Sequence, residues 1–305
     1  MVNPDLIAIA PHRNPLFEKA IAAAGGVPCD IGPEVGGLVW TDYHNPQELK
    51  TVLAANPQLT WVQLPWAGVD AFADLLKHPV RFTSAKGSYR EPVAEHALML
   101  AMALGRELPE RIRATTWGEK FAVSLYDSNV VVVGGGGIAE EFIALTRPMR
   151  TRVTVVRRQI GALEGADKTV TFDQLDSVLA EAQFVILACA LTEETRGLFD
   201  SRRLALMNPN AYLVNVARGP IVVTEDLLDA LDAGVLAGAG IDVTDPEPLP
   251  QGHRAWGNPR LIITPHTADT PPQVEHFLAL RIGANALAYL GQGPWIGQVD
   301  PVAGY

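Results

Sequence analysis

Residues 130–142 read VVVVGGGGIAEEF, a run of four valines followed by four glycines and then by residues that favour a helix. A flexible glycine linker lies between polar segments, whereas these glycines directly follow a strand-like run and open a helical one. Gly134, Gly136 and Ala139 match the spacing G-x-G-x-x-G/A. That spacing turns the chain tightly, lets the backbone approach a pyrophosphate and points a helix N-terminus at its charge. The stretch therefore predicts a dinucleotide-binding turn.

Apolar runs rich in β-branched residues alternate with amphipathic segments from residue 130 onward. The runs are continuous, which is typical of parallel strands that are buried on both faces. Segments of helical length lie between them, as right-handed crossovers require. Residues 97–270 are therefore predicted to form an α/β domain with a doubly wound parallel sheet, of the Rossmann type. The expected strands are 130–133, 153–156, 184–188, 211–216, 238–243 and 261–264, and the expected helices are 138–147, 173–181, 201–207 and 224–233.

The first ninety residues show a second and weaker α/β rhythm. Residues 91–113 form one long apolar-striped segment with Pro92 in its first turn, and this segment is expected to bridge the two halves of the chain. Residues 272–290 read as a further helix that packs back onto the first half. We therefore predict a smaller, flavodoxin-like α/β substrate domain that is discontinuous, with residues 1–96 plus 271–305. Its expected strands are 6–10, 37–40 and 59–64, and its expected helices are 16–24 and 46–56.

The composition of the chain argues against several classes of protein. Of its 305 residues 48% are apolar, which is enough for a sizeable core, and the net charge of −10 disfavours a nucleic-acid partner or a polybasic membrane surface. The N-terminus does not resemble a signal peptide, and no apolar run approaches the roughly 20 residues of a membrane helix. Cys29 and Cys189 are far apart in sequence, and no His, Cys and Asp cluster suggests a metal ion. These features favour a cytoplasmic protein with no membrane partner.

Four chemically active side chains lie at the ends of predicted strands in the larger domain. Arg218 and His266 directly follow strands, Asp242 ends one, and Glu247 lies in the loop beyond it. Open α/β sheets form their ligand crevice at the carboxyl ends of the strands. Taken singly, each residue has a plainer interpretation, as a surface arginine, a strand-end aspartate, part of a solvated acidic loop, or a loop histidine. His96, on an apolar helix face, is interpreted as a structural histidine.

Further motifs follow one another in a fixed order. They are WAGVD at 66–70, VAEHALML at 93–100, LTEETRGLFD at 191–200, NVARGPIV at 215–222, GAGIDVTDPEPLP at 238–250 and PHTA at 265–268. Several independent motifs in one order are more specific than a glycine fingerprint. With them the chain resembles the D-isomer-specific 2-hydroxyacid dehydrogenases, which use NAD(P), over most of its length. The first ninety residues match poorly outside WAGVD, as expected of a substrate domain that varies.

The resemblance implies that Arg218, Glu247 and His266 form the catalytic set. A planar guanidinium can fork onto the oxygens of a 2-oxo acid, and an imidazole can deliver a proton near neutral pH. A carboxylate beside the imidazole favours its charged form, and the nicotinamide supplies the hydride. The substrate-binding residues implied are Ala67, Gly68, Val69, Arg218 and His266. The cofactor-binding residues implied are Gly134, Gly136, Gly137, Ile138, Arg157, Arg158, Cys189, Ala190, Thr195, Val216, Ala217, Arg218, Asp242 and His266.

The cofactor preference depends on the end of the predicted strand 153–156. An NAD enzyme of this fold places Asp or Glu there to bind the ribose hydroxyls, whereas this chain has Arg157 followed by Arg158. Two guanidiniums would bind a 2′-phosphate that a carboxylate would repel. NADP(H) is therefore expected to be favoured, with NAD(H) as the alternative if both arginines are merely exposed.

The resemblance leaves more than one function open. The leading hypothesis is a reductase of small 2-oxo acids, similar to glyoxylate and hydroxypyruvate reductases. The alternatives are a phosphoglycerate-type NAD-dependent dehydrogenase and a non-enzymatic NAD(P)-sensing corepressor or scaffold on the same fold. The complete catalytic set argues against a sensor, which needs no proton donor, and Glu247 argues against formate dehydrogenases, which have Gln there. In the family the helix near residues 92–104 packs across a dimer, so a homodimer is expected.

Three residues depart from the family's pattern. Ala190 stands where a proline often lies beside the adenine, Val223 where an acidic residue is common, and Asp269 where a glycine is common. The first departure puts one adenine contact in doubt, whereas the other two do not touch the proposed chemistry. Tyr89 and Arg90 have two interpretations, at the mouth of the active site or on the surface.

Overall fold

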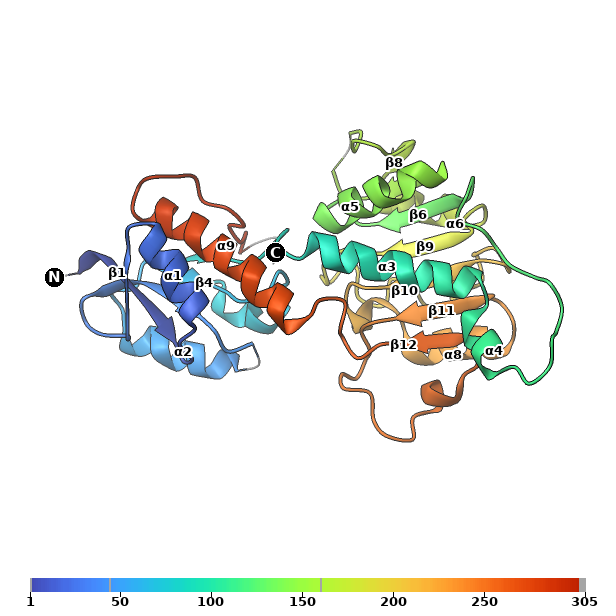
Figure 1. The fold of residues 1–305 in the computed structure, drawn as a ribbon, viewed down its shortest axis with the longest axis horizontal. Coiled ribbons are helices and arrows are strands. Elements are labelled where there is room, and N and C mark those ends of the chain that lie inside the picture. Colours follow the sequence, from blue (N-terminus) through green and yellow to red (C-terminus); the bar gives the residue numbers. More distant parts are fainter. Residues whose placement is uncertain (1, 44, 160, 302–305) are drawn as a thin grey trace. The chain divides into compact units, whose positions relative to one another are not determined.

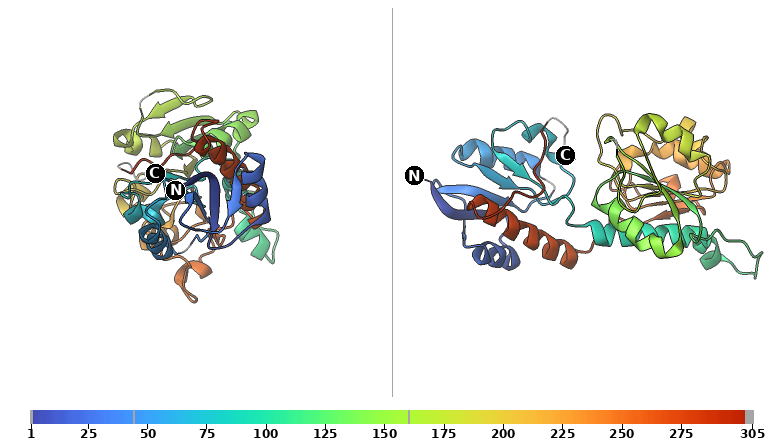
Figure 2. Two further views of the ribbon diagram at one scale, coloured as in Figure 1. Left: turned by 90° about the vertical axis from the view of Figure 1, so that its left-hand side faces the viewer. Right: turned by 90° about the horizontal axis from the view of Figure 1, so that it is seen from above.

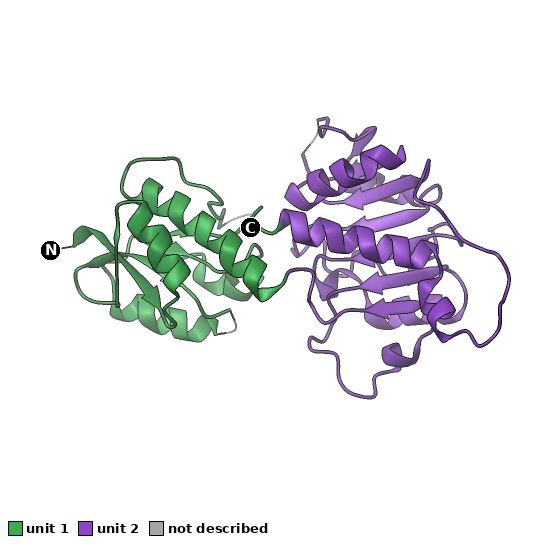
Figure 3. Cartoon of the chain, viewed as in Figure 1, with its two compact units in different colours: residues 1–89, 270–305 green, residues 90–269 purple. Residues whose placement is uncertain are grey.

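The computed structural model describes residues 2–43, 45–159 and 161–301, and the chain divides into two compact units (Figures 1 and 3). Unit 1 consists of residues 1–89 and 270–305, and unit 2 consists of residues 90–269. The chain thus passes between the units twice, and unit 1 is discontinuous in sequence. Within the described residues no helix is both long and apolar enough to span a bilayer.

Unit 2 contains a seven-stranded parallel sheet. Its strands are β6 (Asn129–Val133), β7 (Arg152–Val156), β8 (Lys168–Val170), β9 (Phe184–Leu187), β10 (Tyr212–Asn215), β11 (Gly238–Ile241) and β12 (Leu261–Ile263). The order β12-β11-β10-β9-β6-β7-β8 runs outward in both directions from the β6–β9 pair, so the doubly wound prediction is confirmed. The edge strand β8 is absent from the sequence prediction because it is three residues long and begins with Lys168 and Thr169.

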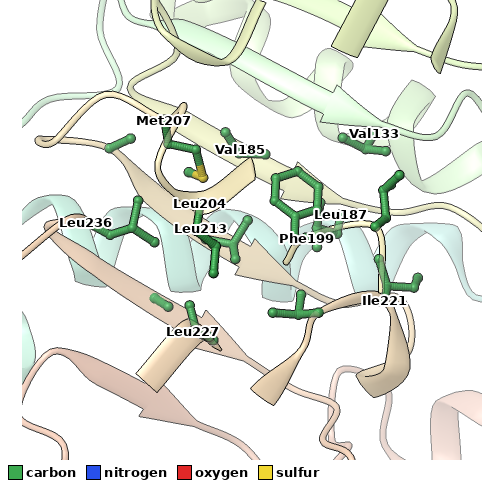
Figure 4. Packing of buried hydrophobic residues seen from close by; sticks show 14 of the residues in the cluster. Val133, Val185, Leu187, Phe199, Leu204, Met207, Leu213, Ile221, Leu227 and Leu236 are labelled. Atoms are coloured by element: carbon green, nitrogen blue, oxygen red, sulfur yellow. The ribbon is translucent and has the colours of Figure 1, made fainter. Parts of the chain in front are cut away.

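Helices cover both faces of this sheet (Figure 2). One face carries α3 (Arg90–Gly105) and α5 (Gly137–Thr146), and the other carries α6 (Leu175–Leu179), α7 (Ser201–Leu204) and α8 (Thr224–Asp232). Alternate strand residues, among them Val185 and Leu213, pack under α6, α7 and α8 in one apolar cluster (Figure 4). On the opposite face Gly240 lies so close to α3 that an added Cβ would be 3.2 Å from the Cβ of Leu100. The glycines of β11 therefore let α3 rest directly on the sheet.

The apolar-striped segment 91–113 forms two helices, α3 and α4 (Leu108–Arg113). Pro109 has no amide to continue the helix, and the amide of Val123 takes the Gly105 carbonyl at 2.7 Å instead. Glu107, between the helices, adopts a left-handed φ of 53°. The remaining elements of unit 2 are the short 3-10 helices η2 (Arg147–Met149), η3 (Phe172–Gln174), η4 (Gly219–Ile221) and η5 (Arg254–Gly257).

Unit 1 has its own five-stranded parallel sheet in the flavodoxin-like order β2-β1-β3-β4-β5, as expected. Its elements are β1 (Asn3–Ala10), α1 (Pro15–Ala23), β2 (Val27–Cys29), β3 (Val35–Trp40), α2 (Pro46–Ala55), β4 (Trp61–Gln63), η1 (Asp70–Leu75), β5 (Arg81–Thr83) and α9 (Pro271–Tyr289). The C-terminal helix α9 packs against α1, and its Asn285 donates to the buried Gln63 of β4 at 2.7 Å. This polar contact inside the core fixes the last helix to the first half of the chain.

The turn after β6 generates a stability prediction. Gly134 has a φ of +121°, and a Cβ there would collide with the backbone carbonyl of Ala188. Gly134→Ala should therefore lower the free energy of unfolding by at least about 2 kcal/mol, as measured by urea denaturation. Gly136→Ala is the matched control, because no atom lies within 4 Å of a Cβ at that position. Equal stabilities of the two variants would contradict this description of the turn.

Candidate active site

The turn between β6 and α5 has a shape that fits a pyrophosphate. The close approach at Gly134 packs the turn against the loop after β9, while the backbone at Gly136 faces open space. Helix α5 begins at Gly137, and its N-cap Gly136 contributes no side-chain hydrogen bond. The first amides of the helix, through Gly137 and Ile138, therefore have no side-chain cap and lie beside an open backbone. Such a helix N-terminus attracts an anion.

Arg157 and Arg158 lie directly beyond β7, at the same edge of the sheet as the glycine turn. The aliphatic stem of Arg157 covers Gly135, where a Cβ would collide with it. Its guanidinium donates to the carbonyls of Gln159 and Gly161, both at 3.2 Å. The Nε of Arg158 lies 3.7 Å from a carboxylate oxygen of Glu194 in the loop after β9. The stem of Arg157 thus packs on the glycine turn, and Arg158 is paired with the loop after β9.

The loop after β9 is closed by Thr195. Its hydroxyl donates to the carbonyl of Ala190 at 2.7 Å and accepts from the amide of Thr192 at 2.8 Å. Burial raises the pKa of the Cys189 thiol to about 12, so this thiol stays protonated and inert near neutral pH. We therefore interpret the thiol of Cys189 as a structural group and not as a reactive one.

Arg218 is positioned by a turn at the end of β10. The buried side chain of Asn215 accepts from the amide of Ala217 and donates to the carbonyl of Arg218, both at 3.0 Å. The half-buried guanidinium of Arg218 donates to the carbonyl of Ala217 at 2.7 Å, and Val216 is buried behind it. A Cβ at the next residue, Gly219, would collide with the backbone of the loop that follows β11. The loops after β10 and β11 therefore lie against each other.

His266 and Glu247 form a close charged pair at the site. The Nδ1 atom of His266 lies 2.6 Å from Oε1 of Glu247, and the other oxygen of Glu247 accepts from the Thr244 amide at 3.3 Å. The hydrogen bond that His266 donates to Glu247 raises the pKa of His266, although partial burial and the positive charge of Arg218 act against it. Burial acts to raise the pKa of Glu247, but the bond to His266 holds it below its ordinary value. The site thus favours an imidazolium beside a carboxylate.

Asp242 organises the turn that carries His266. Its carboxylate accepts from the Thr264 hydroxyl at 2.6 Å and from the amides of Thr267 and Ala268 at 2.9 and 3.0 Å. Its backbone carbonyl accepts from the His266 amide at 2.8 Å. Burial acts to raise the pKa of Asp242, but its hydrogen bonds hold that pKa below the ordinary value. With a side chain only 1% exposed, the carboxylate serves the protein's own backbone at this turn.

In unit 1, the loop after β4 presents three consecutive amides. Ala67, Gly68 and Val69 donate to no other residue within the described part of the chain. The ring of Trp66 lies 6.1 Å from that of Tyr89, whose hydroxyl donates to the carbonyl just before Trp66 at 2.9 Å. Consecutive unpaired amides are suited to an anion such as a carboxylate. Tyr89 is only 4% exposed, so it is not a surface residue, and its hydrogen bond supports this loop.

Asp269 and Val223, which depart from the family's pattern, and Arg90 all lie at or near the starts of helices. Burial raises the pKa of Asp269, two residues before α9, although the charge of His266 partly offsets that effect. Val223 is the N-cap of α8 and provides no side-chain cap. Arg90 begins α3, with its Nε 3.9 Å from a carboxylate oxygen of Glu141.

Sequence reasoning misses three residues that shape the site, namely Thr264, His96 and Asn215. Thr264 and His96 meet at Asp242 although 168 residues separate them. No periodicity or spacing signals such a contact. Asn215 is the first residue of the NVARGPIV motif, but the motif alone does not indicate that its side chain shapes the turn before Arg218. Among the described residues no group of His, Cys, Asp and Glu side chains could hold a metal ion.

Several known proteins and one family model are similar to this chain. Residues 96–268 match the family model described as D-isomer specific 2-hydroxyacid dehydrogenase, NAD binding domain. The chain is 34% identical over 255 residues to the "Uncharacterized protein in proB 3'region" of Corynebacterium melassecola, with 81% of this chain and 84% of that one covered. It is 28% identical over 285 residues to the glyoxylate reductase/hydroxypyruvate reductase of Mus musculus, with coverages of 90% and 83%.

The fold has a similar relative among solved structures. It matches the crystal structure of a D-isomer specific 2-hydroxyacid dehydrogenase from Xanthobacter autotrophicus Py2 in complex with NADPH and MES. The TM-score is 0.85, the sequence identity is 27%, and the match covers 99% of both chains.

The pair at the sheet edge predicts a measurable pKa change. Glu247→Gln removes the carboxylate that raises the pKa of His266 and leaves the opposing charge of Arg218 in place. The pKa of His266 should therefore fall in this variant. A pH titration of the imidazole NMR signals measures it, with His266→Gln used to assign the resonance. An unchanged His266 titration would show that the pair does not form in solution.

Proposed function

The chain belongs to the D-isomer-specific 2-hydroxyacid dehydrogenase family, and we propose that within it the protein is an NADP(H)-dependent reductase of small 2-oxo acids such as glyoxylate and hydroxypyruvate. The chain is a dehydrogenase that works with a nicotinamide dinucleotide. The catalytic role is supported by one observation, the 2.6 Å His266–Glu247 pair on loops at the same sheet edge as Arg218 and the glycine turn. A proton donor, its carboxylate and a forked cation are the groups that reduction of a 2-oxo acid requires.

Each side chain has a distinct task in the proposed mechanism. Because Nδ1 of His266 is committed to Glu247, Nε2 is the atom that gives its proton to the carbonyl oxygen of the substrate. Glu247 keeps the ring oriented and favours its protonated form. The guanidinium of Arg218 holds a carboxylate or carbonyl oxygen of the substrate, and the amides of Ala67, Gly68 and Val69 hold the carboxylate. The reduced nicotinamide, when bound, supplies the hydride to the carbonyl carbon.

The site argues against only one of the two competing functions. A sensor or scaffold on this fold would have no use for the paired imidazole and carboxylate, which this site retains. A phosphoglycerate-type dehydrogenase would use the same catalytic set, so only substrate assays separate it from the reductase. The mouse relative's name, glyoxylate reductase/hydroxypyruvate reductase, supports the smaller substrates.

The proposed NADP(H) preference depends on Arg157 and Arg158. Both follow β7, where an acidic residue would bind the ribose hydroxyls of NAD(H). The stem of Arg157 covers Gly135 of the pyrophosphate turn, which places its cation beside the expected cofactor site. NAD(H) remains the alternative cofactor. The match to a relative solved with NADPH supports the preference without deciding it.

We also propose a cytoplasmic homodimer formed through α3 and the segment that follows it. Exposed large apolar side chains concentrate between residues 99 and 126, and Ile112 and Trp117 are 74% and 91% exposed. Such a concentration on one segment is typical of an interface. Sedimentation should give a dimer for the parent and a monomer after Ile112→Glu with Trp117→Glu. Trp256→Glu, at an exposed tryptophan outside this segment, is the control that should stay dimeric.

The reductase assignment predicts the behaviour of an arginine variant. The parent should oxidise NADPH or NADH with glyoxylate or hydroxypyruvate, and Arg218→Lys should lower kcat/KM for the 2-oxo acid. The expected loss is roughly 10- to 150-fold for each charge-assisted hydrogen bond that the lysine cannot make. Arg260→Lys, before the amino end of β12, is the control and should keep the parent's rate. A parent inactive on every small 2-oxo acid would contradict the proposed function.

The cofactor assignment predicts a reversal. Arg157→Asp introduces an acid that binds ribose hydroxyls and repels a 2′-phosphate. Its kcat/KM with NADPH should fall roughly 10- to 150-fold, the effect of losing a charge-assisted bond, while that with NADH changes far less or rises. Arg152→Asp, at the other end of the same strand, is the matched control. Equal use of both cofactors by the parent and by Arg157→Asp would establish that the arginines do not read the phosphate.

A further inference from the structure

His96 is the one side chain of α3 whose ring reaches the turn of the proposed proton donor. Its ring is 13% exposed, and its Nε2 lies 2.9 Å from the Thr264 hydroxyl and 3.4 Å from Oδ1 of Asp242. The mechanism proposed above makes no use of this residue. The backbone of His96 is held in place, because α3 packs directly on Gly240 of β11 through Leu100, one helical turn after His96.

The directions of these hydrogen bonds can be assigned by counting protons. The carboxylate of Asp242 only accepts, so the Thr264 hydroxyl, 2.6 Å away, must give it its single proton. The Thr264 oxygen can then only accept from His96. His96 therefore carries a proton on Nε2 and donates it. The result is a directed relay from His96 through Thr264 to Asp242.

The far end of this relay holds a turn that is unfavourable on its own. His266 adopts a left-handed φ of 52°, a backbone region that residues other than glycine rarely occupy. The turn is held by bonds to Asp242 from the amides of His266, Thr267 and Ala268. If the carboxylate of Asp242 rotates, the two amides after His266 lose their acceptors together. The orientation of the imidazole then changes.

We propose that His96 is a positioning residue for His266: by donating through Thr264 it fixes the Asp242 carboxylate, and the carboxylate fixes the left-handed turn that aims the proton donor. This inference rests on the proposed function for its catalytic consequence. In this role His96 does more than form hydrogen bonds for its own ring. It sets the geometry of the proton donor His266. Removing the donor should affect proton transfer more than cofactor binding.

Two pairs of variants test the relay. His96→Leu and Thr264→Val remove it, whereas His96→Gln keeps an N–H donor and Thr264→Ser keeps the hydroxyl. We expect kcat for the 2-oxo acid to fall about tenfold in the first pair, the value of one buried hydrogen bond, and to recover in the second pair. The Kd for NADPH or NADH, measured by cofactor fluorescence, should change less than kcat, because the glycine turn and the arginines after β7 lie outside this relay. Glu95→Gln, at an exposed neighbour on α3, is the control.

A double-mutant cycle separates positioning from general support of the fold. If His96 acts through His266, His96→Leu should leave the residual rate of His266→Ala unchanged within about twofold. A tenfold loss in that background, or a His96→Gln variant as slow as His96→Leu, would overturn the inference. So would a His96→Leu variant with the parent's kcat.

A second readout does not depend on activity. Besides Asp242, the groups that influence the charge of His266 are Glu247, Arg218 and Asp269. A turn that loosens should weaken the pair with Glu247, so the NMR-measured pKa of His266 should fall in His96→Leu and return in His96→Gln. If the parent reduces no 2-oxo acid, the proposed function fails, while this titration still supports or overturns the positioning role. An unchanged His266 pKa in His96→Leu would overturn it.

Discussion

The carboxylate of Asp242 is the contact on which the rest of the site depends. It accepts hydrogen bonds from the two amides after His266 and from the hydroxyl of Thr264. The backbone carbonyl of Asp242 accepts from the amide of His266. Without those acceptors a left-handed histidine would relax, because L-residues rarely stay in that region unaided. The acid then could not keep its contact with Glu247. The buried carboxylate of Asp242 thus stabilises the left-handed turn at His266, and this turn places the imidazole beside Glu247.

Close backbone contacts bring the other groups to the same edge of the sheet. Gly219 lets the loop of Arg218 touch the loop after β11, which carries Glu247, and Gly134 packs the glycine turn against the loop after β9. The His266 and Glu247 side chains are about two-fifths exposed, at 39% and 40%, so solvent screens their pair and its contribution to stability is small. Its importance is chemical, because the neighbouring carboxylate raises the pKa of the imidazole and so favours its protonated form.

The sequence predicts those features that depend on local spacing. The glycine turn, the buried parallel strands and the positions of Arg218 and His266 at strand ends all follow from short-range patterns. The short strands β2, β5 and β8 escape prediction, because each has only three residues and includes a proline or polar residues in place of a continuous apolar run. The break at Glu107 depends on a competing bond from Val123, and the role of His96 depends on residues far away in the chain. Such features arise only when packing brings distant segments together.

The central claim is that His266, held protonated by Glu247, gives its proton to a 2-oxo acid during reduction. Single-turnover oxidation of cofactor by glyoxylate or hydroxypyruvate, followed as a function of pH with enzyme in excess, tests this claim most directly. The account predicts a rate constant that is level at low pH and falls as pH rises through the pKa of His266, which lies above the ordinary histidine value of about 6.5. A rate constant that stays level from about pH 5.5 to 9.5, well past any histidine pKa of this kind, would contradict it.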